Sequence, residues 1–561
     1  MRFRTLAPLL TVLGACADLP QNEGVETSEA AACVPGVVLS SDLRPERSLA
    51  ITDPNVVGSA TGPFRLEGVL RQLARQANPS LTDTTAAPVA LDLYRQWWAT
   101  FDVTAGDTTR PHCDSPDPRV LAGFVGPSFN GFPWACPRGE RLNQDVPMAN
   151  WRPTALFYRP DLMPTNFANC GEARIVYHRD FSTTAIFEAK IRNPTPGCIE
   201  GCRRVAQFWA DFSTERVNGL PLDALTIQSR LFAFYMTGTA IPGLGPIIHI
   251  DNFSGSSGGA YAGSSGQVRT NVISDFPWEL KEFAVRRLGT TNARRIELRP
   301  QTDKVNPSPL LFANMPVESG PTADDLRARM STFRTQFING DVEKLAFGDI
   351  NTFTMAPLDT ANAGVSRSGS GDFQNPNTNY SQQAGNEMRA LIQARIDVLR
   401  ARAVRPLVNA SITPDVILAR ATAMSCSGCH FNSNNAFIGD TGPGGPTRWP
   451  ADAGFVHVSF SQGGRDINGG SSGFFLSNAL TQVFLPARQN VLASFLTATR
   501  CPTCPSPSPS PSASPSFASQ ESGLASSPSA SPSASPSSSP SPSPSFGPEP
   551  WSETIGGRTV H

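Results

Sequence analysis

Two short runs decide the fold class: Arg174-Ile175-Val176-Tyr177 and Thr184-Ala185-Ile186-Phe187-Glu188-Ala189-Lys190-Ile191. Both are rich in β-branched and aromatic residues, and turn-forming residues separate them, which is typical of two neighbouring β-strands. Residues 247–250 and 295–299 continue this series of β-prone runs. The sequence therefore predicts a β-rich body built on antiparallel sheet.

Helical periodicity accompanies the strands. Apolar residues recur one helical turn apart in residues 64–74, and residues 91–101 repeat the pattern with Tyr94, Trp97 and Trp98, which we interpret as core residues. Further helices are expected at residues 201–212, 323–338, 386–403, 416–424 and 480–496, with mixed structure at 222–234. A sheet accompanied by helices in this order predicts the α+β class.

The strongest chemical signal is Cys426-Ser427-Gly428-Cys429-His430. C-x-x-C-H is the spacing of covalent c-type haem attachment, because two thiolates can add to the two vinyl groups of one haem while the adjacent histidine ligates the iron. The motif predicts one haem c, attached through Cys426 and Cys429, with His430 as the proximal iron ligand. The alternative is a Cys426–Cys429 disulfide beside a surface histidine.

The first residues predict export. Met1-Arg2-Phe3-Arg4 is a basic segment, and the apolar run of residues 5–15 that follows it is too short for a transmembrane anchor. The run ends in Leu13-Gly14-Ala15-Cys16, which resembles the lipobox of bacterial lipoproteins. That resemblance implies that Cys16 carries a lipid, and an ordinary secretory signal is the alternative.

The cysteine content fits an oxidising compartment. Apart from Cys16, Cys426 and Cys429, the chain contains Cys33, Cys113, Cys136, Cys170, Cys198, Cys202, Cys501 and Cys504. This even number allows disulfides, but it also allows on the order of a hundred connectivities, among which the sequence does not choose. The pairs Cys198 with Cys202 and Cys501 with Cys504 could each close locally.

Residues from about 405 to 500 resemble class I cytochromes c. A helix leads into the C-x-x-C-H motif, a loop-rich region follows, and an apolar helix that includes residues 491–496 ends the segment. The resemblance implies a second axial ligand downstream, usually methionine, but no methionine follows Met424. His457 lies between the motif and the tail and is therefore the candidate distal ligand; the alternative is a half-buried strand residue.

The body has a resemblance of its own. Residues 152–162, 170–177 and 278–283 resemble segments of uncharacterised exported proteins of myxobacteria and other proteobacteria. This resemblance supports export and implies no activity. For Glu172, Arg174 and Glu282 we favour structural ion pairs over a catalytic role.

Composition and motifs divide the chain into six segments. They are a lipoprotein signal peptide (1–15), a flexible tether (16–32), a β-rich α+β body (33–358), a linker (359–383), a mostly helical cytochrome c-like domain (384–500) and a low-complexity Pro/Ser-rich tail expected to be disordered (501–561).

Together these features predict an exported, lipid-anchored monohaem protein that faces the periplasm or cell surface. It is expected to transfer electrons to a protein partner that the sequence does not identify. Two alternatives stay open: a haem-dependent oxidoreductase of peroxidase type, and a haem-free binding or structural lipoprotein. We predict no catalytic residue, because no acid–base constellation accompanies the motif. The net charge of −1 and the scattered basic residues give no support to a nucleic-acid partner.

Overall fold

The computed structural model describes residues 39–98, 147–253, 266–301, 328–346, 386–402 and 411–497, apart from gaps at 182, 215, 218–219, 273–278, 289–294, 329–330, 333, 424–428, 430–432, 441–445 and 452–456. The predicted signal peptide, tether, linker and tail lie outside these residues. So do Cys16, Cys426 and His430.

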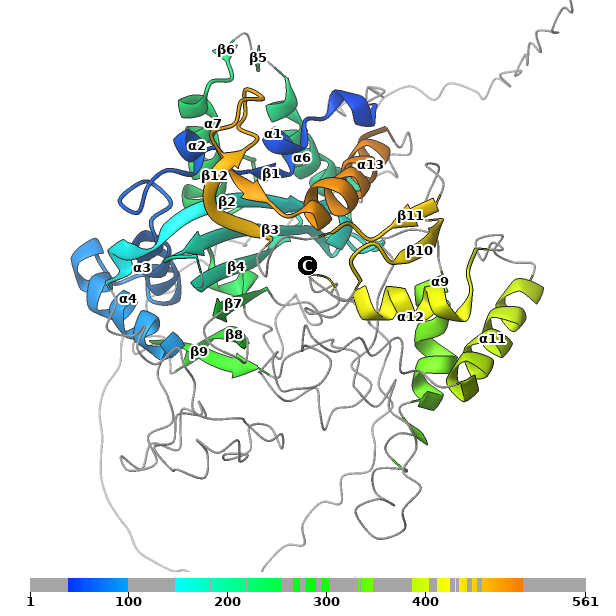
Figure 1. The fold of residues 1–561 in the computed structure, drawn as a ribbon. Coiled ribbons are helices and arrows are strands. Elements are labelled where there is room, and N and C mark those ends of the chain that lie inside the picture. The colour runs from blue at the N-terminus through cyan, green and yellow to red at the C-terminus, as the bar shows by residue number, and fades with distance from the viewer. Residues whose placement is uncertain are drawn as a thin grey trace, which may run out of the picture.

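A seven-stranded antiparallel sheet forms the centre of the fold, with strand order β1-β2-β3-β4-β7-β8-β9 (Figure 1). The strands are β1 (Ala50–Ile51), β2 (Arg152–Arg159), β3 (Asn169–His178), β4 (Thr183–Arg192), β7 (Gln267–Val272), β8 (Glu279–Leu288) and β9 (Arg295–Gln301). The strands predicted at 174–177, 184–191 and 295–299 are confirmed, and so is the α+β class.

One face of the sheet is aromatic and packs against helices. Tyr158 of β2 stacks on Trp209 of α6 (Ile199–Ala210), with 5.5 Å between ring centroids. The Tyr177 hydroxyl donates to the Phe64 carbonyl oxygen (2.7 Å), just before α3 (Leu66–Ala77). The hydroxyl of Tyr235, which follows α7 (Ala224–Phe232), reaches backbone oxygens of β2 and β3. The predicted helices at 64–74 and 201–212 are thus confirmed as core elements.

A disulfide joins the sheet to α6. Cys170 of β3 is bonded to Cys202, across 32 positions of sequence. Cys198, at the start of α6, is also disulfide-bonded. The local Cys198–Cys202 pairing that the sequence left open is therefore wrong, because Cys202 faces β3 instead.

The strand expected at residues 247–250 is also wrong. The N–H groups of Ile247 and Ile248 donate to the carbonyl oxygens of Phe234 and Tyr235 (3.2 and 2.8 Å). Those carbonyls belong to the π-helical turn η6 (Ala233–Thr237), which ends at Gly238 in the left-handed region. The N–H groups of Ile247 and Ile248 thus satisfy carbonyl oxygens at the end of a helix, and they are not available to pair with a strand.

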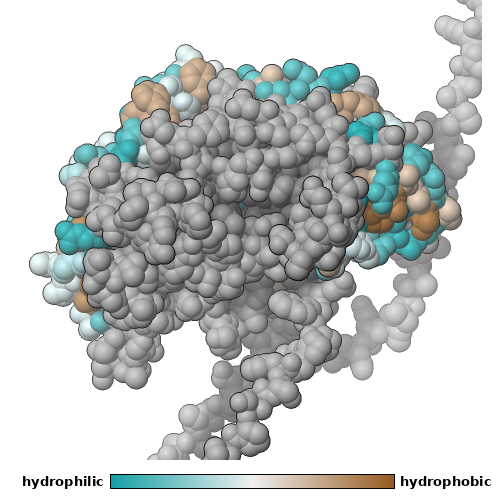
Figure 2. Space-filling model, turned by 60° about the horizontal axis from the view of Figure 1, so that its bottom comes forward, coloured by the Kyte–Doolittle hydropathy of each residue, from teal (hydrophilic) through white to brown (hydrophobic). Residues whose placement is uncertain are grey.

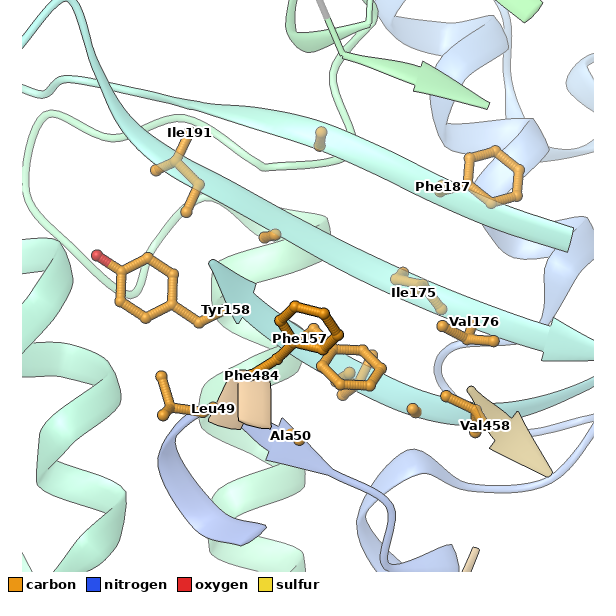
Figure 3. Close-up of a cluster of buried hydrophobic side chains, with 14 of the residues drawn as sticks. Leu49, Ala50, Phe157, Tyr158, Ile175, Val176, Phe187, Ile191, Val458 and Phe484 are labelled. Carbon is orange, nitrogen blue, oxygen red and sulfur yellow. The ribbon is translucent and has the colours of Figure 1, made fainter. Parts of the chain in front are cut away.

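The C-terminal elements pack on the body. They are β12 (Val458–Gly464), β13 (Gly473–Leu476), η13 (Leu480–Phe484) and α13 (Leu485–Thr497). Figure 3 shows Val458 and Phe484 in the same buried cluster as Phe157 and Val176 of the sheet. Backbone contacts support this placement, including Phe474 N–H to the Thr52 carbonyl oxygen (3.1 Å). Residues 458–497 thus share the core of the body.

The C-terminal half contains more strand than we expected. Besides the helices α11 (Asn386–Ala401) and α12 (Pro414–Ala423), the described part of residues 384–500 contains β12, β13 and a hairpin of β10 (Phe437–Asp440) and β11 (Pro446–Arg448). Pro486 is the second residue of α13, which follows the π-helical turn η13 without a break. The remaining elements are η1 (Ser40–Asp42), α1 (Pro45–Ser48), α2 (Pro54–Val57), α4 (Asp83–Trp98), η3 (Met148–Asn150), η4 (Pro160–Leu162), η5 (Asp211–Ser213), β5 (Arg216–Val217), β6 (Leu220–Pro221), η7 (Ile250–Asn252), η9 (Phe337–Asp341) and α9 (Val342–Ala346).

The described surface is mixed in polarity. In Figure 2, hydrophobic side chains at the coloured edges of the molecule are interspersed with hydrophilic ones. Exposed large apolar residues include Leu91 of α4 and Leu391 of α11, and isolated residues of this kind are ordinary on protein surfaces. Among the helices that the structure describes, none is long and apolar enough to cross a membrane.

Buried His178 makes stability depend on pH. Burial lowers its pKa to about 4, although the Val458 backbone and Asp180 favour the charged form. The unfolded chain titrates near 6.5 and binds more protons than the folded chain between these values, so stability falls as the pH drops from about 6.5 to 4. The expected loss is about 3 kcal/mol.

This loss can be measured by chemical denaturation at several pH values. His178→Asn, which cannot titrate in this range, should show a correspondingly smaller loss between pH 6.5 and 4. Equal pH dependence in the variant and the wild type would contradict the assignment to His178.

Candidate functional site

Cys429 is buried at the centre of the C-terminal elements. Its residue is 1% exposed, and its sulfur is a thiol that takes no part in a disulfide. The indole Nε1–H of Trp449 donates to the Cys429 carbonyl oxygen (2.8 Å). The second motif cysteine, Cys426, and the adjacent His430 lie outside the described residues, so Cys429 alone fixes where the motif sits.

Helix α12 sets the position of the motif. Thr413 Oγ1 accepts from the Val416 N–H (3.2 Å) and so caps the helix, and Pro414 is the first helical residue. Near the other end, the buried Arg420 donates from Nε to the Ile438 carbonyl oxygen (2.7 Å) and from Nη1 to the Leu345 carbonyl oxygen (2.6 Å). These bonds fix α12 to β10 and α9 a few residues before Cys426.

The β10–β11 hairpin holds Trp449 against the motif. Trp449 N–H donates to the Ala436 carbonyl oxygen, and Asn435 N–H donates to the Trp449 carbonyl oxygen, both at 2.8 Å. Asn435 has a φ of 60°, a left-handed conformation that asparagine tolerates. The other side of the indole meets the ring of Phe484, with 5.6 Å between centroids. Trp449 thereby forms an apolar wall with Phe484 beside Cys429.

The structure brings His457 next to Cys429. Nε2 of His457 lies 3.7 Å from Cys429 Sγ, and Nδ1 lies 2.8 Å from Ser477 Oγ. Ser477 is itself held, because its N–H donates to the His457 carbonyl oxygen (2.9 Å) and its Oγ accepts from Leu480 N–H (3.2 Å). When Nδ1–H donates to Ser477, Nε2 carries a lone pair and faces the cysteine. His457 is half-buried and directly precedes β12.

These residues fit a covalently bound haem. A ligating histidine ordinarily donates its other ring N–H to a fixed acceptor, which is the place Ser477 Oγ occupies. The aromatic side chains of Trp449 and Phe484 beside the Cys429 thiol are the kind of apolar surface against which a porphyrin would pack. Within the described ranges, which omit Cys426 and His430, no group of three or more His, Cys, Asp or Glu side chains could hold a metal ion.

The face of the sheet opposite Tyr158 carries a second group of polar residues, here called the charged sheet face. Its cross-strand neighbours include Arg159 with Glu172 and Arg174 with Glu188. Its described members are Arg159, Glu172, Arg174, Glu188, Lys190, Gln267 and Arg269, all buried, together with Asp161 and Arg488 at one end.

Ion pairs connect these side chains. Arg174 Nε donates to Glu172 Oε1 (2.6 Å), and Arg174 Nη1 lies 3.0 Å from Glu188 Oε1. Lys190 Nζ lies 3.6 Å from Glu172 Oε2, and Arg269 also contacts Glu188. The expectation that Glu172 and Arg174 make ion pairs is therefore confirmed. The side chain of Glu282 lies outside the described residues.

Asp161 links this face to α13. Arg159 donates to both oxygens of its carboxylate (2.9 and 3.0 Å from Nε), and Arg488 Nε of α13 lies 3.4 Å from Oδ1. Burial alone would raise the pKa of Asp161, but Arg159 and Arg488 hold it well below its usual range. One carboxylate thus serves two buried guanidinium groups.

The site residues that the sequence missed are Trp449, Ser477, Phe484 and Arg488. Ser477 precedes a predicted helix and could have been recognised as its N-cap. The other three act through contacts between segments that no local pattern reveals. Comparisons of the chain with protein-family models, with curated proteins and with solved structures find no match.

Proposed function

We propose that this chain is an exported, lipid-anchored c-type haem protein that transfers electrons. One haem is attached through Cys426 and Cys429, His430 is its proximal ligand and His457 its distal ligand. The observation that carries the proposal is the placement of His457 Nε2, 3.7 Å from the buried Cys429 thiol, with Nδ1 held by Ser477. Residues 384–500 form its cytochrome c-like region, and the Pro/Ser-rich residues 501–561 act as a spacer.

The chain's own residues bind and shield the cofactor. Trp449 and Phe484 exclude water from one side of the site, and Ser477 orients His457. The haem supplies a one-electron couple, and covalent attachment prevents its loss outside the cytoplasm. A haem stain after denaturing electrophoresis tests the proposal. A stained band at the size of the chain is expected, whereas an unstained band would leave only the haem-free alternative.

The distal ligand is tested by His457→Ala. If His457 completes a six-coordinate site, the wild-type spectrum is low-spin and the variant becomes high-spin or binds an added ligand, while the covalent haem remains. The measurement is the absorption spectrum of both proteins with and without imidazole. His249→Ala, which removes a partly buried histidine from another part of the fold, serves as the control.

A low-spin spectrum that survives His457→Ala would contradict this ligand assignment. A wild-type spectrum that is already high-spin would favour the peroxidase-type alternative, because that chemistry needs an open iron position.

The lipid anchor is tested by Cys16→Ser. We expect the variant to move from the membrane fraction to the soluble fraction, because the proposed lipid on Cys16 provides the membrane affinity. The measurement is an immunoblot of the membrane and soluble fractions of a bacterial host that processes lipoproteins. Cys33→Ser is the control for the loss of a nearby cysteine. Retention of the Cys16→Ser variant in the membrane would contradict lipidation at this position.

A further inference from the structure

Arg488 is a buried cation whose guanidinium group has unfilled hydrogen-bond donors. Its residue is 2% exposed, and neither Nε nor Nη2 has a hydrogen-bond partner with good geometry among the described residues. The nearest carboxylate is that of Asp161, with Oδ1 3.4 Å from Arg488 Nε. Both oxygens of this carboxylate already accept hydrogen bonds from the Arg159 guanidinium group. A buried guanidinium with unfilled donors is costly unless another acceptor satisfies it.

The electrostatic surroundings favour a second anion at this place. Burial and the nearby guanidinium groups of Arg159 and Arg174 lower the pKa of Arg488, and Asp161 only partly opposes them. The other charged members of the sheet face are Glu172, Glu188, Lys190 and Arg269, and the Tyr158 hydroxyl is a buried neutral neighbour of Asp161. A guanidinium fork matches a carboxylate in shape as well as in charge.

A continuous wall connects Arg488 to the motif. The guanidinium carbon of Arg488 lies 5.5 Å from the centroid of the Phe484 ring, one helical turn earlier in the chain. Phe484 meets Trp449, and Trp449 donates to the Cys429 carbonyl oxygen. Two aromatic side chains therefore separate the cation from the cysteine that would carry the haem.

We propose that Arg488 binds a propionate carboxylate of the haem attached to Cys426 and Cys429. The thioether edge and the propionate edge lie on different sides of a porphyrin. A haem lying along the Trp449–Phe484 wall would therefore direct its carboxylates away from Cys429 and toward Arg488. This inference rests on the proposed function, and it assigns to the body's charged sheet face a role in binding the cofactor.

The test is the midpoint potential of the full-length haem protein, measured from about pH 5 to pH 9. In the wild type the propionate paired with Arg488 stays ionised from about pH 5 to pH 9. Its titration therefore adds no slope to the plot of midpoint potential against pH. In Arg488→Gln the unpaired carboxylate should favour the ferric state and lower the potential. The propionate pKa should rise by about 1 to 3 units, which introduces a pH-dependent slope. Arg488→Lys should lie between the two, because it keeps the charge without the fork.

Arg47→Gln is the matched control. Arg47 is also a buried arginine, and it donates to the Leu222 carbonyl oxygen (2.8 Å), away from Asp161. Its loss should leave the potential and its pH dependence unchanged. Potentials of Arg488→Gln that match those of Arg47→Gln at every pH would overturn the proposal.

Two further results distinguish the inference from the proposed function. If the wild type carried no covalent haem, both would fail; if it carried haem and Arg488→Gln behaved like the wild type, only the role of Arg488 would fail. Should Arg488→Gln not accumulate as a haem protein, the wild-type titration decides. A propionate that titrates within the measured range in the wild type would contradict an arginine partner.

Discussion

Replacing Cys426 and Cys429 together by alanine is expected to abolish covalent haem while the body stays folded. Both thioether bonds require these sulfurs, whereas the sheet, α6 and the Cys170–Cys202 disulfide do not involve them. The loss of haem should be complete by haem staining. The far-UV circular dichroism of the sheet should be retained, because Cys429 is one of many side chains in the buried core and lies outside the strands of the sheet.

The chain contains its own control for this variant. Cys501 and Cys504 form a second C-x-x-C pair, but the residue directly after it is Pro505 and not a histidine. The double alanine variant of this pair should bind haem as the wild type does. Haem retained by the Cys426/Cys429 variant, or lost equally from both variants, would contradict attachment at the motif.

Asp161→Ala is expected to destabilise the protein by about 3 to 5 kcal/mol, the usual cost of removing one partner from a buried ion pair. The Asp161 side chain is 5% exposed, and its loss leaves the buried guanidinium groups of Arg159 and Arg488 without their shared carboxylate. The expected effect includes loosening of α13, because Arg488 is an anchor of that helix on the body. Chemical denaturation of the haem-free proteins measures the change.

Asp180→Ala provides the matched comparison. Asp180 also pairs with an arginine, Arg179, but its side chain is 38% exposed. Loss of such a pair should cost no more than about 1 kcal/mol. If the two variants differed from the wild type by the same small amount, the buried pairing of Asp161 would not stabilise the fold as we describe.

Strong local patterns predicted the body well. The strands β3 and β4 and the helices α3 and α6 follow from β-prone runs and from apolar residues at helical spacing. The run at 247–250 misled for a physical reason, since its N–H groups satisfy the end of a helix. Strand β12 contains Ser, Gln and Gly, so its pairing with β13 rather than intrinsic preference sets its conformation.

Some residues of the candidate site could be predicted from the sequence, and others could not. Cys429 and His457 could be selected from the sequence because of the motif and the scarcity of histidines, and the structure brings the two together. Trp449 and Arg488 could not be selected, because their positions depend on how the β10–β11 hairpin and α13 pack beside the motif. Glu172 and Arg174 were assigned to ion pairs on charge alone, but their partner Glu188 follows from strand register.

The pyridine haemochrome spectrum of the full-length protein, produced together with cytochrome c maturation machinery, tests the central claim most directly. The expected result is one haem per chain, with the band position of a haem whose two vinyl groups have become thioethers, and no haem extractable by acidified organic solvent. A chain without haem absorption would contradict the claim, most clearly if it contained one zinc ion per chain, because Cys426, Cys429, His430 and His457 are also zinc-type ligands.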